Sequence, residues 1–222
     1  VGDWFPFEQR GRALGWLFGA MAGGMAFGST AGVILEPFIT WQGLFLVVAV
    51  LGFVVLLLLL SHREMLVGNP SRTSTPYRQV LAGYLGLLSS SRGKRTYGYV
   101  LLNAIFHSGV FTWLGLYFAQ RYSLGAIGIG LALLGYGVPG FLFGPLIGRL
   151  VDRWGRARLL PAGLAIAGSS AAGLAAGVPL PLAAALVTTL SLGYDMTQPL
   201  LAGIVTDLSP NRGQAMGLNV FT

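Results

Sequence analysis

A charged segment between two long apolar runs constrains the fold of this chain more than any other feature. It reads Gly-Arg-Leu-Val-Asp-Arg-Trp-Gly-Arg-Ala-Arg over residues 148–158, in a chain with only 9% Asp, Glu, Lys and Arg. Soluble domains average about 25% charged residues. The mean hydropathy is +0.70. We therefore expect a polytopic membrane protein in which residues 148–158 form a turn at the membrane surface between two helices.

Six segments are apolar and long enough to cross a bilayer, which takes about 20 residues of helix. A seventh begins near Gly213 and runs to Thr222. The six expected spans are residues 14–35, 43–60, 97–119, 124–147, 159–179 and 182–206. The predicted fold class is all-α, a transmembrane helical bundle with six full spans and a partial seventh.

The connections between the expected spans alternate in charge. All but one of the 14 Lys and Arg residues lie in residues 1–12, 61–96, 148–158 and 207–212. The exception, Arg121, lies in one of the short connections, which are residues 36–42, 120–123 and 180–181. Because cytoplasmic loops carry the excess of Lys and Arg, the charged connections are predicted to be cytoplasmic. A bacterial plasma membrane is the expected location.

The longest connection, residues 61–96, separates two sets of spans. Its middle is rich in Ser, Thr and Pro, which indicates a flexible linker. Apolar residues then recur at helical spacing, at Val80, Leu81, Tyr84, Leu87 and Leu88. This pattern predicts a short amphipathic helix at the membrane surface.

A short motif occurs twice, each time where a span begins. Residues 3–15 and 207–217 both fit Asp-x-x-Pro followed, after one or three residues, by Arg-Gly-x-Ala-x-Gly. The shared pairs are Arg10 with Gly11 and Arg212 with Gly213. Their separation equals about six spans, and parallel six-helix halves are known in secondary transporters. Chance similarity of two Gly-rich turns is the alternative.

The chain resembles the major facilitator superfamily in its motifs. Residues Gly148, Asp152, Arg153, Gly155, Arg156 and Arg158 match the family signature Gly-x-x-x-Asp-Arg-x-Gly-Arg-x-Arg between helices 8 and 9. Trp41-Gln-Gly-Leu-Phe45 is similar to the family's entry to helix 6, and the glycine-rich first span is similar to helix 5. The Gly-Pro pair typical of antiporter members is missing from that span.

The resemblance implies that the chain is a fragment that covers helices 5 to 10 and the start of helix 11. Residues 1–60 would then be the last two helices of the N-terminal bundle, and residues 61–96 the cytoplasmic linker. Residues 97–222 would be the C-terminal bundle, truncated in its fifth helix.

The resemblance also assigns a gating role to the charged motif. In the family, the Asp of this motif contacts the start of helix 11, so Asp152 is expected beside Gly213 and Ala215. A helix N-terminus carries a partial positive charge that attracts a carboxylate. This contact would hold the cytoplasmic side shut. The alternative is a turn that only sets the orientation of the chain in the membrane.

Two ionisable residues, His107 and Asp195, lie at membrane depth, where such residues are functional candidates. Counted along their helices, they lie about 15 Å and about 20 Å from the span ends. Each shares a helix face with further polar residues, and two such stripes need a water-filled cavity or each other. The predicted substrate and proton pathway consists of Asn103, His107, Thr188, Ser191, Asp195 and Gln198. A structural His–Asp hydrogen bond between two helices is the alternative.

The sequence also excludes several function classes. It has no cysteine and no phosphate-binding loop of the ATPase type. We expect no cofactor, metal site, catalytic residues or nucleic-acid binding. The predicted function is secondary active transport of a small solute by alternating access, with protons or another ion as coupling partner and lipids as surroundings. The alternative is a polytopic membrane protein that does not transport, either an intramembrane enzyme or a structural or sensor unit.

Overall fold

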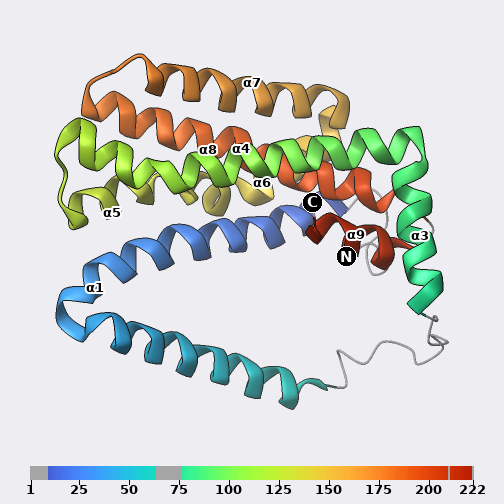
Figure 1. The fold of residues 1–222 in the computed structure, drawn as a ribbon, viewed down its shortest axis with the longest axis horizontal. Helices are drawn as coiled ribbons and strands as arrows, with labels where there is room; N and C mark the ends of the chain where they lie inside the picture. The colour runs from blue at the N-terminus through green and yellow to red at the C-terminus, as the bar shows by residue number, and fades with distance from the viewer. Residues whose placement is uncertain (1–9, 64–76, 210, 222) are drawn as a thin grey trace.

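The computed structural model describes residues 10–63, 77–209 and 211–221, and these form helices joined by short connections (Figure 1). No strand occurs within these ranges. The all-α class is therefore confirmed. The helices are α1 (Arg10–Ser61), α3 (Tyr77–Ser89), α4 (Ser91–Tyr122), α5 (Ala126–Leu134), α6 (Val138–Trp154), α7 (Arg156–Ala175), α8 (Leu180–Thr206) and α9 (Arg212–Phe221).

Five stretches of the described chain are long and apolar enough to cross a membrane. They are Arg12–Glu36, Phe38–Ser61, Ser91–Tyr122, Ala126–Trp154 and Arg156–Ala175, and they correspond to the first five predicted spans. The sixth predicted span coincides with α8, whose 27 residues reach about 40 Å. Polar residues lower the hydropathy of α8, so it is not among the five. It packs against α7, α6, α1, α9, α4 and α5, which places those polar residues inside the bundle.

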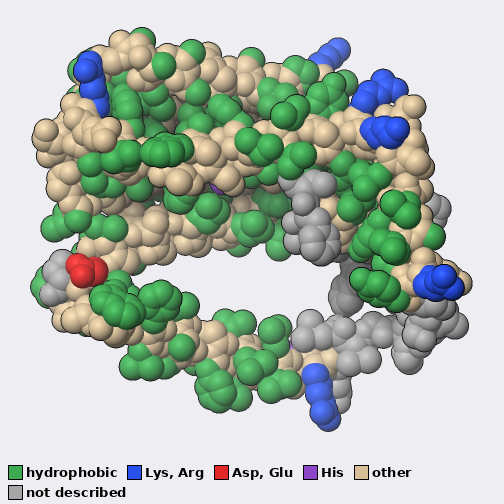
Figure 2. Space-filling view, viewed as in Figure 1, with side chains coloured by type: hydrophobic (Ala, Val, Ile, Leu, Met, Phe, Trp, Pro, Cys, Tyr) green, Lys and Arg blue, Asp and Glu red, His purple; other side chains and the backbone are tan. Residues whose placement is uncertain are grey.

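Helix α1 consists of two arms that meet at Thr40. The backbone there has φ 59° and ψ 165°, a positive φ that a β-branched residue rarely adopts. The first arm, Arg12–Glu36, packs against α6 and α5. The second arm, Phe38–Ser61, turns away from the other helices (Figure 1), and none of its most apolar stretch is buried. Figure 2 shows hydrophobic side chains along this second arm.

Glycines bring the first arm of α1 into direct backbone contact with α6. A Cβ added to Gly19 would lie 2.9 Å from the carbonyl oxygen of Gly140, and one added to Gly144 would lie 2.5 Å from that of Gly15. Small residues spaced four apart permit such close packing of membrane helices. The interface therefore depends on the absence of side chains at these positions.

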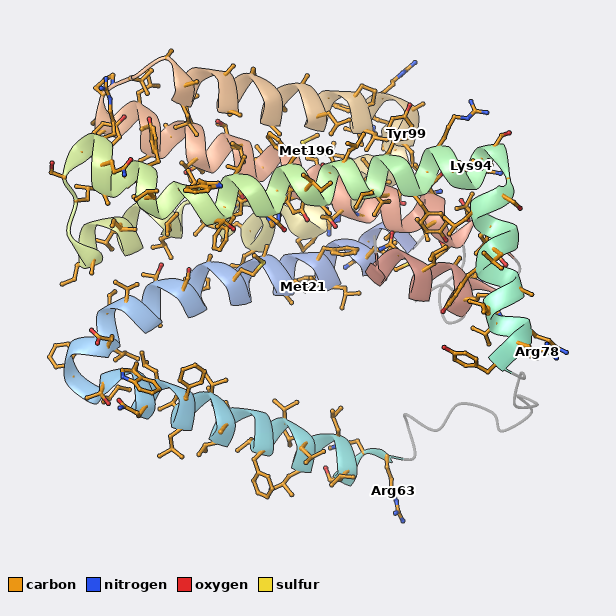
Figure 3. All side chains as sticks on the ribbon, viewed as in Figure 1. Met21, Arg63, Arg78, Lys94, Tyr99 and Met196 are labelled. Atoms are coloured by element: carbon orange, nitrogen blue, oxygen red, sulfur yellow. The ribbon has the colours of Figure 1, made fainter. Side chains whose placement is uncertain are left out.

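The described part of the predicted cytoplasmic linker, residues 61–96, contains α3 and the start of α4. Helix α3 occupies its second half, and the Gln214 side chain of α9 donates a hydrogen bond to the Val80 carbonyl of α3 at 2.7 Å. Helix α4 begins at Ser91, earlier than expected, because the Ser90 hydroxyl accepts from the Gly93 N–H at 3.0 Å and caps it. The Ser/Thr/Pro-rich segment, residues 69–76, lies outside the described residues. Figure 3 shows Arg78 on α3 and Lys94 near the start of α4 at the right of the view, and Arg63 at the end of the second arm of α1.

Candidate functional site

The fourth predicted span, residues 124–147, is broken rather than continuous. Helix α5 ends at Leu134 and α6 begins at Val138, with Gly137 between them at φ 119°. Glycine adopts this positive φ without strain, and Pro139 in the first turn of α6 has no N–H to leave unpaired. Tyr136, at the break, is only 3% exposed.

Asp195 of α8 lies against the first turn of α6. A Cβ added to Gly140 would sit 2.5 Å from the Asp195 Oδ2 atom, and the carboxylate is within reach of the Gly140 backbone N–H. The Ser191 hydroxyl donates to the same Oδ2 at 3.0 Å. The first N–H groups of a helix lack partners within it and carry a partial positive charge. Asp195 therefore lies at the N-terminus of a helix other than its own.

His107 of α4 is held by aromatic rings rather than by Asp195. Its ring stacks on Tyr194 with centroids 3.6 Å apart and planes inclined by 14°. The Tyr136 ring lies 5.3 Å away and the Phe111 ring 6.4 Å away. His107 and Asp195, both described, form no direct hydrogen bond with each other. The structure therefore does not contain the structural His–Asp hydrogen bond that was the alternative interpretation.

His107 and Asp195 nevertheless line one cavity of about 50 Å³, between α1, α4, α6 and α8. A volume of this size holds a few water molecules. Ser191 and Gln198 line it too, so four of the six predicted pathway residues lie together. The other lining residues are Phe18, Met21, Ala22, Met25, Tyr136, Gly137 and Tyr194.

The remaining two predicted pathway residues lie elsewhere. The Asn103 side-chain amide donates to the Thr197 hydroxyl at 3.0 Å and joins α4 to α8. Asn103 also borders a wider apolar groove between α4, α7 and α8. The Thr188 hydroxyl donates to the Ala184 carbonyl of its own helix at 3.0 Å, a common arrangement for Thr inside helices.

The charged motif is mostly helical, so the turn predicted over residues 148–158 is wrong in extent. Gly148, Asp152 and Arg153 belong to α6, whereas Arg156 and Arg158 belong to α7. Gly155 alone lies between the two helices, at φ 78°, and its freedom to adopt that φ makes a one-residue turn possible.

An ion pair that the sequence did not predict ties the motif to α8. The Arg156 guanidinium donates to the Asp207 carboxylate at 2.5 Å, and both side chains are partly exposed. Asp207 is the C-cap of α8, where a negative charge is unfavourable beside the helix dipole, so Arg156 offsets it. The guanidinium lies over Gly203, whose missing side chain leaves the room.

We expect Arg156→Glu to lower the free energy of unfolding by about 1 kcal/mol, because exposed ion pairs contribute little and reversal adds repulsion. The Arg156→Glu, Asp207→Arg double variant should recover most of that loss. Thermal unfolding of the four proteins in a double-mutant cycle, at low and high salt, measures the coupling. Additive losses in the double variant would contradict the pairing.

The predicted contact of Asp152 with the start of α9 stays a prediction. Asp152 is exposed in the last turn of α6, and Gly213 has room for a Cβ, which would meet only Asn211 Oδ1 at 3.7 Å. Arg10 and Arg212, the arginines of the repeated motif, are the first residues of α1 and α9. Gly11 and Gly213 follow them, whereas Asp3, Pro6 and Pro210 lie outside the described residues.

Several helices that are long and apolar enough to cross a membrane, packed around a small cavity that His107 and Asp195 line, define a multi-pass helical membrane protein. The family model of the Major Facilitator Superfamily matches residues 1–222. The chain therefore belongs to the Major Facilitator Superfamily, a family of membrane transporters of small molecules. Searches of curated proteins and of solved structures found no match.

Proposed function

We propose that this transporter moves a small solute by alternating access and couples it to protons at the cavity between α1, α4, α6 and α8. The observation that carries the proposal is that His107 and Asp195, both ionisable, line that one cavity. Ionisable residues at membrane depth are costly and mark ion or proton pathways. Because these side chains come from α4 and α8, a change in their charge would alter the relative position of the two helices.

Helix α6, the second part of the broken fourth span, would couple proton binding to the movement of the helices. When charged, the Asp195 carboxylate accepts from Ser191 and attracts the first turn of α6. Proton binding removes the charge and weakens this attraction, because a helix N-terminus favours an anion. The glycine interface between α1 and α6 offers few side chains to resist a shift of α6. Proton occupancy would therefore bias the position of α6.

We further propose that the gate lies at the cytoplasmic end, where the charged motif meets the end of α8. The Arg156–Asp207 pair joins α7 to α8 there. Asp152, Arg153 and Arg158 add charge at the same junction, and Asp152 would reach the start of α9 in the closed state. The Lys and Arg residues of this end would face the cytoplasm of a cell membrane.

His107→Gln is expected to shift or flatten the pH profile of transport, because glutamine cannot titrate where histidine does. A panel of labelled solutes first identifies a substrate for the full product of the gene that encodes this chain, reconstituted in proteoliposomes. Initial uptake is then measured against pH for both proteins. His62→Gln is the matched control, since His62 is exposed at the end of α1 and away from the cavity. An unchanged profile in His107→Gln would argue against a proton role for this residue.

A further inference from the structure

The cavity has a chemical character that the proposed coupling does not explain. Among the described residues, its lining includes one carboxylate, Asp195, one histidine, His107, and no lysine or arginine. That carboxylate accepts from the neutral Ser191 hydroxyl and lies against the Gly140 backbone. A buried charge without a countercharge is expensive, so this site favours a positively charged occupant. The same lining is unsuited to a carboxylate or phosphate ligand.

Two tyrosine rings, those of Tyr136 and Tyr194, line the same cavity as this carboxylate. Tyr194 stacks on His107, and Tyr136 lies 5.3 Å from His107 and 5.1 Å from Phe111, all between ring centroids. Aromatic faces attract organic cations, most strongly where water is excluded. A proton alone needs no such surroundings, so the rings point to a larger cation.

One residue that lines the cavity has a polar atom without a partner. The Tyr136 hydroxyl is buried and has no hydrogen-bond partner within the described part of the chain. An unsatisfied buried hydroxyl is costly, and it can accept a hydrogen bond from a ligand N–H. Tyr136 lines the same cavity as Asp195.

The opposite wall is apolar and adaptable. Phe18, Met21 and Met25 of α1 line it, and both methionines are more than one-third exposed at its edge. Methionine side chains are flexible and polarisable, so they can move to admit an apolar group larger than the present volume. Met21 is labelled on α1 in Figure 3.

We propose that the cavity binds an aromatic amine in its protonated form, with the ammonium between Asp195 and Tyr136 and the ring against Met21 and Met25. The inference rests on the proposed function in one respect, that this cavity lies on the transport pathway. It adds the chemical class of the substrate. The ammonium supplies the countercharge and an N–H donor, and the ring fills the apolar side.

Three probes of similar size test the assignment. The full gene product in lipid nanodiscs is dialysed against radiolabelled 2-phenylethylammonium, 2-phenylethanol or 3-phenylpropionate, which carry positive, zero and negative charge. We expect the cation to bind at least tenfold more tightly than the other two. Asp195→Asn should weaken cation binding by about 10–100-fold, the usual effect of losing a hydrogen bond to a charged group. Glu36→Gln, which removes an exposed carboxylate at the end of the first arm, should leave it unchanged.

A conservative variant guards against misfolding of Asp195→Asn. Tyr136→Phe keeps the ring and removes only the hydroxyl, so it should weaken cation binding severalfold without changing binding of 2-phenylethanol. Equal binding of the three probes, or a preference for the anion, overturns the inference. So does cation binding that survives intact in both variants.

The outcomes also separate this inference from the proposed function. If the cation binds as expected but Asp195→Asn transports uphill normally, the proton coupling fails and the ligand class stands. If uphill transport depends on Asp195 but none of the probes is preferred, the ligand class fails and the coupling stands.

Discussion

Asp195→Asn is expected to abolish uphill transport of the solute and to leave solute exchange across the membrane measurable. Asparagine has nearly the shape of aspartate and can still accept from Ser191, whose hydroxyl lies 3.0 Å from Oδ2. It cannot bind and release a proton, so a pH gradient no longer drives the cycle. Exchange needs only reorientation of the loaded carrier, which does not require proton release.

Proteoliposomes with and without an imposed pH gradient measure both activities for the substrate found in the panel. Ser191→Ala serves as a graded variant, because it removes one donor to the carboxylate and keeps the charge. Its uphill transport should fall only partly. Uphill transport at the normal rate in Asp195→Asn would show that the proton pathway lies elsewhere.

Much of the fold could be predicted from where the charges and apolar runs lie. Lipid excludes unpaired backbone groups and charges, so the length of each apolar run predicted a helix and each charge cluster predicted an end. Counting residues along two opposed helices placed His107 and Asp195 at similar depth. The structure has both at one cavity.

The break in the fourth span has a sequence pattern of its own, which hydropathy does not reveal. Gly135 and Gly137 flank Tyr136, and Pro139 follows as a residue suited to a first helical turn. Overall hydropathy, which the span count used, is unchanged by such a break. The two glycines and the proline therefore predict a helix break, and a break would make Tyr136 a candidate site residue.

The rest of the site depends on packing that no local pattern contains. Phe18, Met21 and Met25 read as ordinary apolar residues, because a side chain that faces lipid and one that faces a cavity have the same hydropathy. The Arg156–Asp207 pair joins residues 51 positions apart, and it forms because α7 and α8 pack side by side. Only the packing of the helices identifies the contacts of these residues.

Gly19→Leu is expected to separate the first arm of α1 from α6. A Cβ at this position would lie 2.9 Å from the Gly140 carbonyl oxygen and 3.5 Å from the Gly144 Cα, and backbone atoms cannot turn aside as a side chain does. Overpacking of this kind costs about 1–3 kcal/mol, and more where the backbone resists. Because Phe18 and Met21 line the cavity from α1, transport should be lost together with the packing.

Cysteine labelling reports this separation directly, because the chain has no cysteine of its own. Ala22 is 7% exposed in the interface, so Ala22→Cys should react slowly with a maleimide. Adding Gly19→Leu should speed the reaction and lower the melting temperature. Gly24→Leu is the matched control on the same arm, since no heavy atom lies within 4 Å of a Cβ added there. If both leucine variants label and melt alike, the interface does not depend on the glycine, and the close contact of α1 with α6 cannot be what holds the cavity together.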